Sequence, residues 1–481
     1  MENRRVNIVS SITDLNQFQH LSNLIDLVEV RADIIGSLAL NPVQKSTSKV
    51  FVLKSEEEGG TFKGTQEERT QYLIKASQTY DFIELEGERD LIPEILDHIP
   101  PLKRRISWEG VFSNEENLKQ RVEHYRQIPA NVYKIVVKTE SFQDSIAVSN
   151  LVKTDDTNKV IAFAKGNYAR FTQVLPPYLG AAEVHCDFDG EDKYSADQLK
   201  RIYGLPYAYD VQEMYGIVGN PVKNSISPEL HNKAYRASNL PYIYFPFTAT
   251  NFQEFCDQII LNEELPVPLK GLTVVSPFKK DGVTFSKQLK FEENSSGEAC
   301  NGLVFTDTGW EHFSTDAWGA LQALKTVNHW EDKRIAIVGM GGTGQTIAKT
   351  LRKQNIALTL VNRTIEKGKK IAKELAYPFI SLEDFDASHF DIIIHATPLG
   401  KKKGEVPFEL DKLKHQSLVV DHVYPKTDKS ELVKYCELLN IKVIDGKTIA
   451  GIQIQKQFEN MTFRNYPELE NIETKRKIKI N

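Results

Sequence analysis

The sequence is poor in cysteine and carries no excess of positive charge. Four cysteines occur, at positions 186, 256, 300 and 436, and none forms a Cys-x-x-Cys pair, so neither a zinc site nor a disulfide framework is predicted. The 60 basic and 65 acidic residues give a net charge of -5, which offers no electrostatic basis for binding nucleic acid or an anionic membrane. We therefore expect no metal site, and neither nucleic acid nor membrane as a partner.

Two further absences concern targeting. No stretch of about 18 apolar residues is present, so no segment is predicted to span a membrane. The N-terminal residues 1–6 lead into a short strand-like run and not into the apolar core of a signal peptide. Together with the cysteine usage, this pattern favours a cytoplasmic protein.

The length of the chain indicates more than one domain. Its 481 residues exceed one ordinary domain, and 41% hydrophobic with 26% charged residues is typical of globular protein. In the first 205 residues, eight short apolar runs recur roughly every 20 to 32 residues, and most are separated by segments long enough for a helix. This alternation predicts an α/β fold that begins with a (β/α)8 TIM barrel. The predicted strands are 7–12, 27–33, 50–54, 82–86, 105–109, 132–138, 160–164 and 183–188.

Other segments of this region are predicted from the same pattern. Helices are expected at 66–79, 114–127 and 195–203. The sequence Gly-Leu-Pro-Tyr at 204–207 predicts a short linker, after which a second domain begins near Met214.

A glycine-rich turn follows an apolar strand at 334–338. The turn is followed by a helical pattern at 345–353 and by a second strand at 357–362. This order is typical of a Rossmann-type unit, in which the glycines let the backbone approach a pyrophosphate at the N-terminus of the helix. The alternative is a glycine turn in an unrelated α/β protein. The predicted cofactor-binding glycines are Gly339, Gly341, Gly342 and Gly344.

The end of the second strand indicates which dinucleotide binds. NAD enzymes usually place an acid there for the ribose hydroxyls, whereas this chain has Asn362, Arg363 and Thr364. A guanidinium can pair with a 2′-phosphate, so the three residues favour NADP. The alternative is that Arg363 is only a solvated surface residue.

The motifs after residue 214 occur in a specific order. The chain has Tyr-Gly-Ile-Val-Gly-Asn-Pro-Val at 215–222, Ser-Ile-Ser-Pro at 225–228, Pro-Phe-Lys at 277–279, Ser-Thr-Asp at 314–316 and Ala-Thr-Pro-Leu-Gly at 396–400. Over about residues 214–470 it thereby resembles the shikimate dehydrogenase family. The resemblance implies a two-lobed dehydrogenase, with a substrate-binding lobe at 213–317 plus 446–481 and an NADP-binding Rossmann lobe at 318–445.

The resemblance also implies roles for individual residues. Lys279 and Asp316 are the expected catalytic pair, because the alkoxide that develops at the C3 ketone of 3-dehydroshikimate needs a proton and nearby positive charge. Ser225 and Ser227 are expected to hold the substrate carboxylate. The further matches are Asn301 and Gln453 for substrate, and Thr397 and Gly446 for cofactor.

Three positions depart from this family's pattern. Val275, Gly302 and Ser314 stand where the family usually has Thr, Thr and Asn. Each change removes a possible hydrogen bond, and one such loss weakens binding by roughly 1–3 kcal/mol if the partner stays unpaired. The departures leave open a preference for a related polyol acid such as quinate.

Residues 5–205 resemble, more loosely, type I 3-dehydroquinate dehydratase. Glu-Val-Arg-Ala-Asp at 29–33 matches the family's Glu-x-Arg-x-Asp, and Tyr-Lys-Ile at 133–135 matches the strand with the Schiff-base lysine. The resemblance implies that neutral Lys134 attacks the ketone, for which we expect nearby cations and burial to lower its pKa. The residues implied to bind substrate are Glu29, Arg31, Lys54, Glu58 and Arg170.

Two departures affect the catalytic base and the lid of this site. Glu109 stands where the family has a histidine base, and we hypothesise that it acts as the base in a pocket that raises its pKa. His185, on the eighth predicted strand, could also point into the barrel, or could simply be packed there. The lid, usually Ser-Ala-Pro-Gly-Gln, reads Gly-Glu-Asp-Lys-Tyr-Ser at 190–195.

The two resemblances point to consecutive reactions. The predicted function is dehydration of 3-dehydroquinate to 3-dehydroshikimate, followed by NADPH-dependent reduction to shikimate. One alternative is an active shikimate or quinate dehydrogenase with an impaired barrel. Another is a metabolite-binding scaffold or sensor. The expected partners are the small-molecule substrates, and the sequence predicts no particular oligomeric state.

Overall fold

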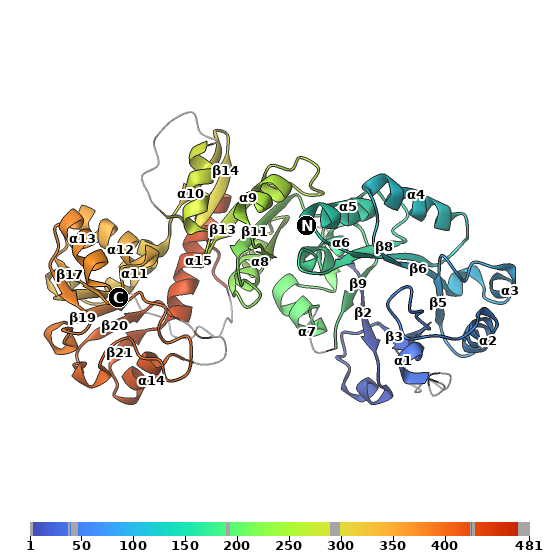
Figure 1. The fold of residues 1–481 in the computed structure, drawn as a ribbon, viewed down its shortest axis with the longest axis horizontal. Coiled ribbons are helices and arrows are strands. Elements are labelled where there is room, and N and C mark those ends of the chain that lie inside the picture. The colour runs from blue at the N-terminus through green and yellow to red at the C-terminus, as the bar shows by residue number, and fades with distance from the viewer. Residues whose placement is uncertain are drawn as a thin grey trace. The chain divides into compact units, whose positions relative to one another are not determined.

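The computed structural model describes residues 3–36, 39, 47–188, 193–288, 299–423, 425 and 429–469. The chain forms two compact units, Met1–Lys270 and Gly271–Asn481 (Figure 1). Residues 190–192 of the predicted lid and the tail beyond residue 469 lie outside the described residues.

The first unit contains the predicted barrel sheet. All eight predicted strands are confirmed, and every neighbouring pair is parallel, in the order β8-β7-β6-β5-β4-β3-β2-β9. Their apolar runs are buried on both faces, as expected for parallel strands covered by helices. The strands are β2 (Asn7–Ile12), β3 (Leu27–Arg31), β4 (Ser48–Val52), β5 (Phe82–Glu86), β6 (Arg104–Gly110), β7 (Val132–Lys138), β8 (Val160–Lys165) and β9 (Glu183–Cys186).

Contacts across the interior show that this sheet curls into a barrel. Arg105 on β6 donates two hydrogen bonds to Glu183 on β9, at 2.7 and 2.6 Å. Five strand spacings separate β6 from β9 in the sheet order, or about 24 Å in a flat sheet. Only a curled sheet brings these side chains together, which confirms the predicted barrel.

The helices of the barrel begin at polar caps. Thr65, Asn114 and Ser141 each accept a hydrogen bond from a backbone N–H in the first turn of the helix that follows. The main helices are α2 (Gln66–Ser77), α4 (Glu115–Arg126) and α5 (Phe142–Lys153), with shorter α1 (Ala32–Ile35), α3 (Pro93–Leu96), α6 (Leu175–Leu179) and α7 (Ala196–Gln198). The predicted helices at 66–79 and 114–127 are confirmed, and α7 continues into a π-helical turn, η5 (Leu199–Tyr203).

The predicted linker at 204–207 is partly wrong. Tyr207 belongs to a short strand, β10 (Tyr207–Ala208), which pairs antiparallel with β1 (Arg4–Arg5). The backbone N–H of Val6 also donates to the carbonyl of Pro206 at 2.9 Å. The two ends of the barrel segment are thus hydrogen-bonded to each other, which a glycine-proline signal does not reveal.

A βαβ segment completes the first unit. Strand β11 (Glu213–Gly219) pairs parallel with β12 (Tyr242–Thr248), and helix α8 (Ser227–Ala237) connects them. Asn232 of α8 donates from its amide nitrogen to the carbonyl of Tyr244 at 2.9 Å, and its amide oxygen accepts from the Tyr244 backbone N–H at 2.9 Å. Helix α9 (Phe252–Phe255) follows.

The second unit contains an antiparallel ladder and a parallel sheet. Strands β13 (Leu269–Val274), β14 (Gly302–Thr306) and β15 (Gly309–Phe313) form the ladder, flanked by α10 (Lys279–Gln288), α11 (Asp316–Leu324) and α15 (Gly446–Thr462). The parallel sheet has the order β18-β17-β16-β19-β20-β21. Numbered from β16, this is the 3-2-1-4-5-6 order of a dinucleotide-binding domain, as predicted.

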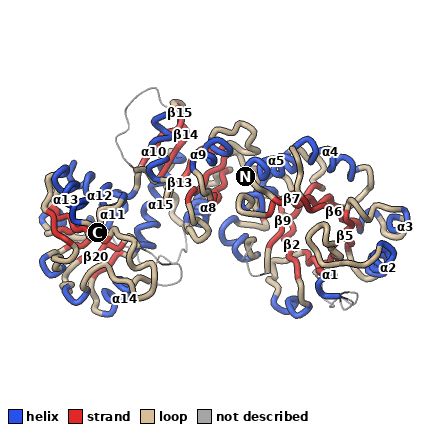
Figure 2. The backbone as a smooth tube through the Cα atoms, in the orientation of Figure 1, coloured by secondary structure: helices blue, strands red, loops and turns tan. Residues whose placement is uncertain are grey.

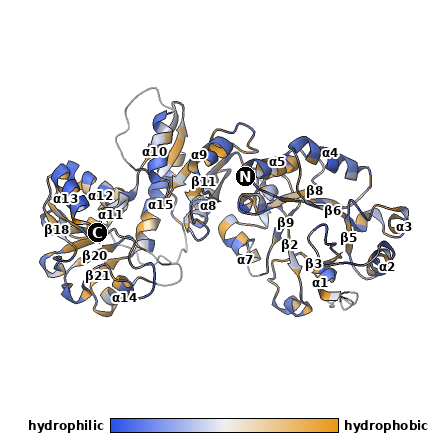
Figure 3. Ribbon diagram, in the orientation of Figure 1, coloured by the Kyte–Doolittle hydropathy of each residue, from blue (hydrophilic) through white to orange (hydrophobic). Residues whose placement is uncertain are grey.

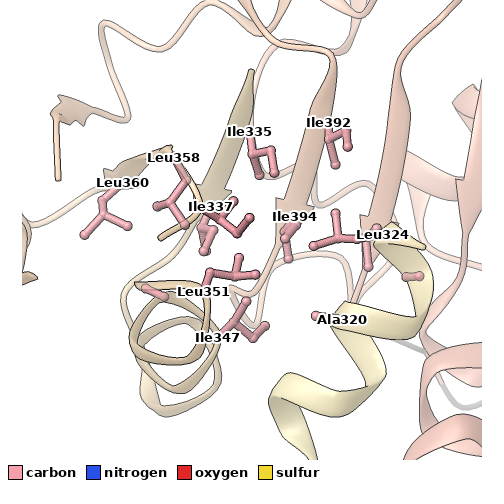
Figure 4. Close-up of a cluster of buried hydrophobic side chains, with 14 of the residues drawn as sticks. Ala320, Leu324, Ile335, Ile337, Ile347, Leu351, Leu358, Leu360, Ile392 and Ile394 are labelled. Atoms are coloured by element: carbon pink, nitrogen blue, oxygen red, sulfur yellow. The ribbon is translucent and has the colours of Figure 1, made fainter. Parts of the chain in front are cut away.

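Helices cover both faces of the parallel sheet (Figure 2). Alternate residues of β16 face opposite sides: Ile335 and Ile337 contact the helices α11, α12 and α13, whereas Ala336 and Val338 lie in a second core with α14. Figure 4 shows the first core, in which Ile347 and Leu351 of α12 pack on the sheet. The elements are β16 (Ile335–Val338), α12 (Gly342–Lys353), β17 (Leu358–Asn362), α13 (Ile365–Leu375), β18 (Phe379–Ser381), β19 (Ile392–His395), β20 (Leu418–Asp421), α14 (Glu431–Leu438) and β21 (Lys442–Ile444).

The distribution of polarity follows from this layering. Figure 3 shows hydrophobic residues along the strands and hydrophilic residues on helices such as α4 and α13. Among the described residues, no helix has both the length and the apolar character needed to cross a membrane.

The buried Arg105–Glu183 pair yields a stability prediction. Arg105→Leu leaves the Glu183 carboxylate in the barrel interior without its bidentate partner, which costs about 3–5 kcal/mol. The double change Arg105→Leu with Glu183→Leu removes both charges, so we expect it to destabilise less than Arg105→Leu alone. Urea-dependent amide hydrogen exchange of barrel peptides, measured by mass spectrometry, checks both expectations.

A surface pair provides the matched control. Lys119→Ala removes the exposed Lys119–Glu115 ion pair, for which about 0.3–0.5 kcal/mol is expected. If Arg105→Leu shifted the barrel transition no more than Lys119→Ala, the interior pair would not support the curled sheet as described.

Candidate active sites

Lys134 lies at the centre of the barrel between two carboxylates. Its ammonium nitrogen is 2.6 Å from Glu29 Oε1 and also forms an ion pair with Glu84. The three side chains come from β7, β3 and β5, and all are buried. Ser11 donates to the other oxygen of Glu29 at 2.7 Å, which fixes that carboxylate.

The charge state of Lys134 differs from our expectation. Burial favours the neutral amine, but the attraction of Glu29 and then of Glu84 outweighs it, and the pKa of Lys134 is raised. The same attraction holds the pKa of Glu29 well below its ordinary value, although burial opposes this. The predicted lowering of the Lys134 pKa is therefore wrong for the free protein, because anions and not cations face the amine.

Glu109 lies at the carboxyl end of β6 and is held by two lysines. Its Oε2 accepts hydrogen bonds from Lys54 and, at 2.8 Å, from Lys165, and its Oε1 accepts from Lys165 at 2.9 Å. Burial alone would raise the pKa of Glu109, but Lys54 and Lys165 lower it. The pocket that we expected to raise this pKa is thus absent, and Glu109 is an ionised anchor for two cations.

The remaining barrel predictions are placed around these groups. Arg31 makes a bidentate pair with Asp33, at 2.8 and 2.7 Å, and interacts electrostatically with Glu84 and Glu29. Glu58 is buried and interacts electrostatically with Glu86, Lys54, Glu84 and Glu109.

Arg170 and His185 have different surroundings. The Arg170 guanidinium lies 4.3 Å from the ring centroid of Tyr194 and donates to its hydroxyl at 3.1 Å, and the structure records no contact of Arg170 with Lys134. His185 points into the barrel, within 3.8 Å of Glu29 and 3.7 Å of Glu183, and burial lowers its pKa. Packing against Phe163, with ring centroids 4.9 Å apart, explains its position.

In the second unit, the turn after β16 contains the glycines that we predicted to bind a dinucleotide. Gly339 has φ +103, and a Cβ there would lie 2.5 Å from Thr397. A Cβ on Gly344 would lie 1.9 Å from the Gly339 carbonyl oxygen, whereas at Gly341 and Gly342 nothing lies within 4 Å. The open space beside two glycines at the N-terminus of α12 fits the pyrophosphate of a dinucleotide.

The other predicted cofactor residues surround this turn. Asn362 accepts from the Met340 backbone N–H at 3.1 Å and donates to the Thr364 carbonyl at 2.9 Å. Arg363 is exposed at the end of β17, as a contact with a 2′-phosphate requires. Gly446 is buried at the start of α15.

Lys279 and Asp316 form an ion pair at 2.6 Å, each as the first residue of its helix. Asn301 donates to the other oxygen of Asp316 at 2.9 Å, and the Thr343 hydroxyl of α12 lies 3.4 Å from Asp316 Oδ2. Asp316 is 4% exposed. The catalytic pair predicted from sequence is thus assembled, beside the helix that begins at the glycine turn.

The surroundings of this pair explain one sequence departure. A Cβ on Gly302 would lie 2.1 Å from the ring of Phe313, so that ring fills the space of the usual threonine side chain. Gln453 of α15 packs against α11, since a Cβ on Gly319 would meet its Cγ at 3.0 Å.

The predicted carboxylate-binding serines belong to the first unit. Ser227 is the first residue of α8 and is buried, and its backbone N–H donates to the Ser225 hydroxyl at 3.2 Å. Their action together with Lys279 and Asp316 stays a prediction.

Several residues of these sites were not predicted from the sequence. Glu84 lies within the apolar run of β5, and Lys165 is the last residue of β8, so the sequence signal of each is a single charge on a barrel strand. His395 on β19 lies 2.8 Å from Asp421 and 2.6 Å from Thr397, and so orients a predicted cofactor residue. Burial lowers the pKa of His422 to about 4, against the attraction of Asp316 and Asp421, which keeps a neutral imidazole near the catalytic pair.

No cluster of histidine, cysteine, aspartate or glutamate that could hold a metal ion occurs among the residues that the structure describes. The cysteines at 186, 256, 300 and 436 are free and buried.

Three family models match consecutive parts of the chain. Type I 3-dehydroquinase matches residues 8–217. The shikimate dehydrogenase substrate binding domain matches residues 217–303, and shikimate / quinate 5-dehydrogenase matches residues 321–426. Their order is the order of the two resemblances found in the sequence.

Curated relatives cover the same regions. The shikimate dehydrogenase (NADP(+)) of Pyrococcus furiosus is 30% identical over 253 residues, which span 52% of this chain and 90% of the relative. The bifunctional 3-dehydroquinate dehydratase/shikimate dehydrogenase, chloroplastic, of Arabidopsis thaliana is 23% identical over 479 residues, spanning 91% of this chain and 77% of the relative. A solved structure, dehydroquinate dehydratase and shikimate dehydrogenase from S. pombe, is 17% identical with a TM-score of 0.44, and covers 96% of this chain and 97% of that one. The chain belongs to the shikimate dehydrogenase family, and a domain of the type I 3-dehydroquinase family precedes the dehydrogenase.

Proposed function

We propose that this chain dehydrates 3-dehydroquinate to 3-dehydroshikimate in its barrel and reduces the product to shikimate with NADPH. The observation that carries the proposal is the presence of two assembled lysine–carboxylate sites, Lys134 with Glu29 and Lys279 with Asp316, in domains of adjacent activities. The free cysteines support a cytoplasmic location.

In the barrel, Lys134 acts as the nucleophile. Its ammonium first gives a proton to Glu29, along the 2.6 Å hydrogen bond, and the neutral amine then attacks the C3 ketone. Loss of water gives an iminium, which acidifies the neighbouring C2–H bond. A base removes the C2 proton, the C1 hydroxyl leaves as water, and hydrolysis of the iminium returns Lys134 and releases 3-dehydroshikimate.

Two cations orient the substrate at the mouth of the barrel, by which we mean the end where the carboxyl termini of the strands lie. Lys54 and Lys165 lie at the carboxyl ends of their strands, where the active sites of such barrels form. Each ammonium has three donors and shares one or two with Glu109, so donors remain for the substrate carboxylate.

In the dehydrogenase site, Lys279 and Asp316 manage the proton. NADPH, when held by the glycine turn with Asn362, Arg363, Thr364, Thr397 and Gly446, supplies the hydride. Lys279 keeps two further N–H donors beside the one directed at Asp316, and these stabilise the developing alkoxide and protonate it. Asn301 and Thr343 keep the Asp316 carboxylate in place. Ser225 and Ser227 bind the substrate carboxylate.

A coupled assay on the purified full chain tests the proposal. With 3-dehydroquinate alone, we expect the absorbance of a conjugated enone to rise as 3-dehydroshikimate forms. Addition of NADPH should then cause its oxidation and the loss of the enone. If added 3-dehydroshikimate is reduced but no enone forms from 3-dehydroquinate, the barrel is not a dehydratase. If the enone forms but NADPH is not oxidised, the dehydrogenase assignment fails. If neither change is observed, both assignments fail.

Two glycine variants separate the cofactor site from the stability of the fold. Gly341→Ala adds a methyl group to open space, so the melting temperature should stay within about 2 °C of wild type while NADPH affinity falls at least about tenfold. Gly344→Ala forces a collision with the Gly339 carbonyl and should lower both the melting temperature and the affinity. Thermal unfolding and NADPH fluorescence titration measure the two effects. Unchanged NADPH affinity in Gly341→Ala would place the pyrophosphate elsewhere.

A further inference from the structure

The mouth of the barrel contains a second carboxyl group with surroundings unlike those of Glu109. Glu58 lies in the segment between β4 and α2 and is 6% exposed. Its Oε1 is buried, and no hydrogen-bond partner for this atom occurs among the described residues. A buried polar atom without a partner is uncommon and calls for a functional explanation.

Glu109 has the opposite character. Both of its oxygens accept hydrogen bonds from lysine ammonium groups, at 2.8 and 2.9 Å from Lys165 and also from Lys54. To take a proton from substrate, Glu109 would have to give up one of these ion pairs. Its position therefore suits an anchor for two cations better than a base.

The loop that carries Glu58 is held over the same site. A Cβ on Gly59 would lie 3.8 Å from Glu109 Oε1 and 3.9 Å from Lys138 Nζ. Two hydrogen bonds fix the loop: the backbone N–H of Gly60 donates to the Ser55 carbonyl at 2.6 Å, and the backbone N–H of Ser55 donates to the side-chain Oε1 of Glu86 at 2.7 Å.

The charges that face Glu58 come from several strands. Glu84 and Glu86 of β5 and Glu109 of β6 repel its ionised form, while Lys54 attracts it. Glu84 also forms the ion pair with Lys134, so Glu58 shares a neighbour with the nucleophile.

We propose that Glu58, and not Glu109, is the carboxyl group that transfers the proton during dehydration. This inference rests on the proposed dehydratase function. The Glu58 carboxylate removes a C2 proton from the iminium, and the electrons of that C–H bond form the C=C bond of an enamine. As the C1–O bond breaks, the protonated Glu58 returns the proton to the departing hydroxyl, which leaves as water. One hydrogen and one hydroxyl leave the substrate, and Glu58 is regenerated.

The acid–base properties of Glu58 agree with this role. Burial, together with Glu86, Glu84 and Glu109, raises the pKa of Glu58 to about 9, so its ionised form is a strong base. The ionised fraction of Glu58 passes its midpoint near pH 9, so the logarithm of this fraction rises with pH below that value and levels off above it. Because Lys134 passes its proton to Glu29 within the site, Glu58 sets the pH dependence: log(kcat/KM) should rise with pH with a slope of about one and bend to a plateau near pH 9.

Glu58→Gln and Glu109→Gln form the matched pair that tests the proposal. Glu58→Gln should lower kcat for enone formation by roughly 10²- to 10⁴-fold. It should also abolish the bend near pH 9 in the plot of log(kcat/KM) against pH. Exchange of the C2 hydrogen of 3-dehydroquinate with solvent deuterium, followed by NMR, should fall in parallel. Glu109→Gln removes the anchor of Lys54 and Lys165 but not the proton carrier, so kcat should fall less than in Glu58→Gln; by removing a negative charge near Glu58 it should also move the bend to lower pH.

The outcomes are distinguishable. Reduction of added 3-dehydroshikimate, unchanged in both variants, shows that the chain is folded, and Glu58→Asp should restore part of the lost rate. If the wild type is active and Glu58→Gln retains its rate and its C2 exchange, the inference is wrong while the dehydratase function stands. If Glu58→Gln does not fold, the pH profile of Glu109→Gln decides: a bend at the same pH as in the wild type overturns the inference. A wild type that forms no enone overturns the dehydratase function and the inference with it.

Discussion

The Lys134 ammonium between Glu29 and Glu84 is the interaction on which the barrel site depends. A charge in an interior of low dielectric is stable only when it is paired, and the free energy needed to bury Lys134 is offset by two carboxylates from β3 and β5. Arg105 and Glu183 repeat this arrangement on β6 and β9. The barrel interior thus contains ion pairs that join strands far apart in the sheet, and these pairs favour the protonated state of Lys134, the proposed nucleophile.

The dehydrogenase site uses a similar pair in different surroundings. Asp316 is buried and receives a hydrogen bond from Asn301, but the Lys279 side chain is 22% exposed, so its ammonium can reach substrate without leaving the interior. Thr343 links this pair to the helix that follows the glycine turn. The proposed sources of proton and hydride thus lie at adjacent helix N-termini.

The sequence predicted the elements well because their signals are local. Apolar runs at even spacing identified all eight barrel strands, and the glycine turn after β16 identified the Rossmann unit. The ion pairs that set the charge states of Lys134 and Glu109 are not local. Lys134 pairs with Glu84, and Glu109 pairs with Lys165, between strands whose register could not be predicted from the sequence. For this reason the directions expected for two pKa values were wrong, while the Lys279–Asp316 pair, carried by a resemblance in specific motifs, was assembled as expected. The boundaries of the two dehydrogenase lobes stay a prediction.

Lys134 is buried and charged in the free protein, and we propose that it is nevertheless the nucleophile of the barrel. The most direct measurement is borohydride reduction of the full chain during turnover of 3-dehydroquinate, followed by peptide mass spectrometry. We expect one covalent adduct, on the peptide that contains Lys134, and none in Lys134→Met. An adduct on Lys54 or Lys165, or turnover without any reducible adduct, would contradict it.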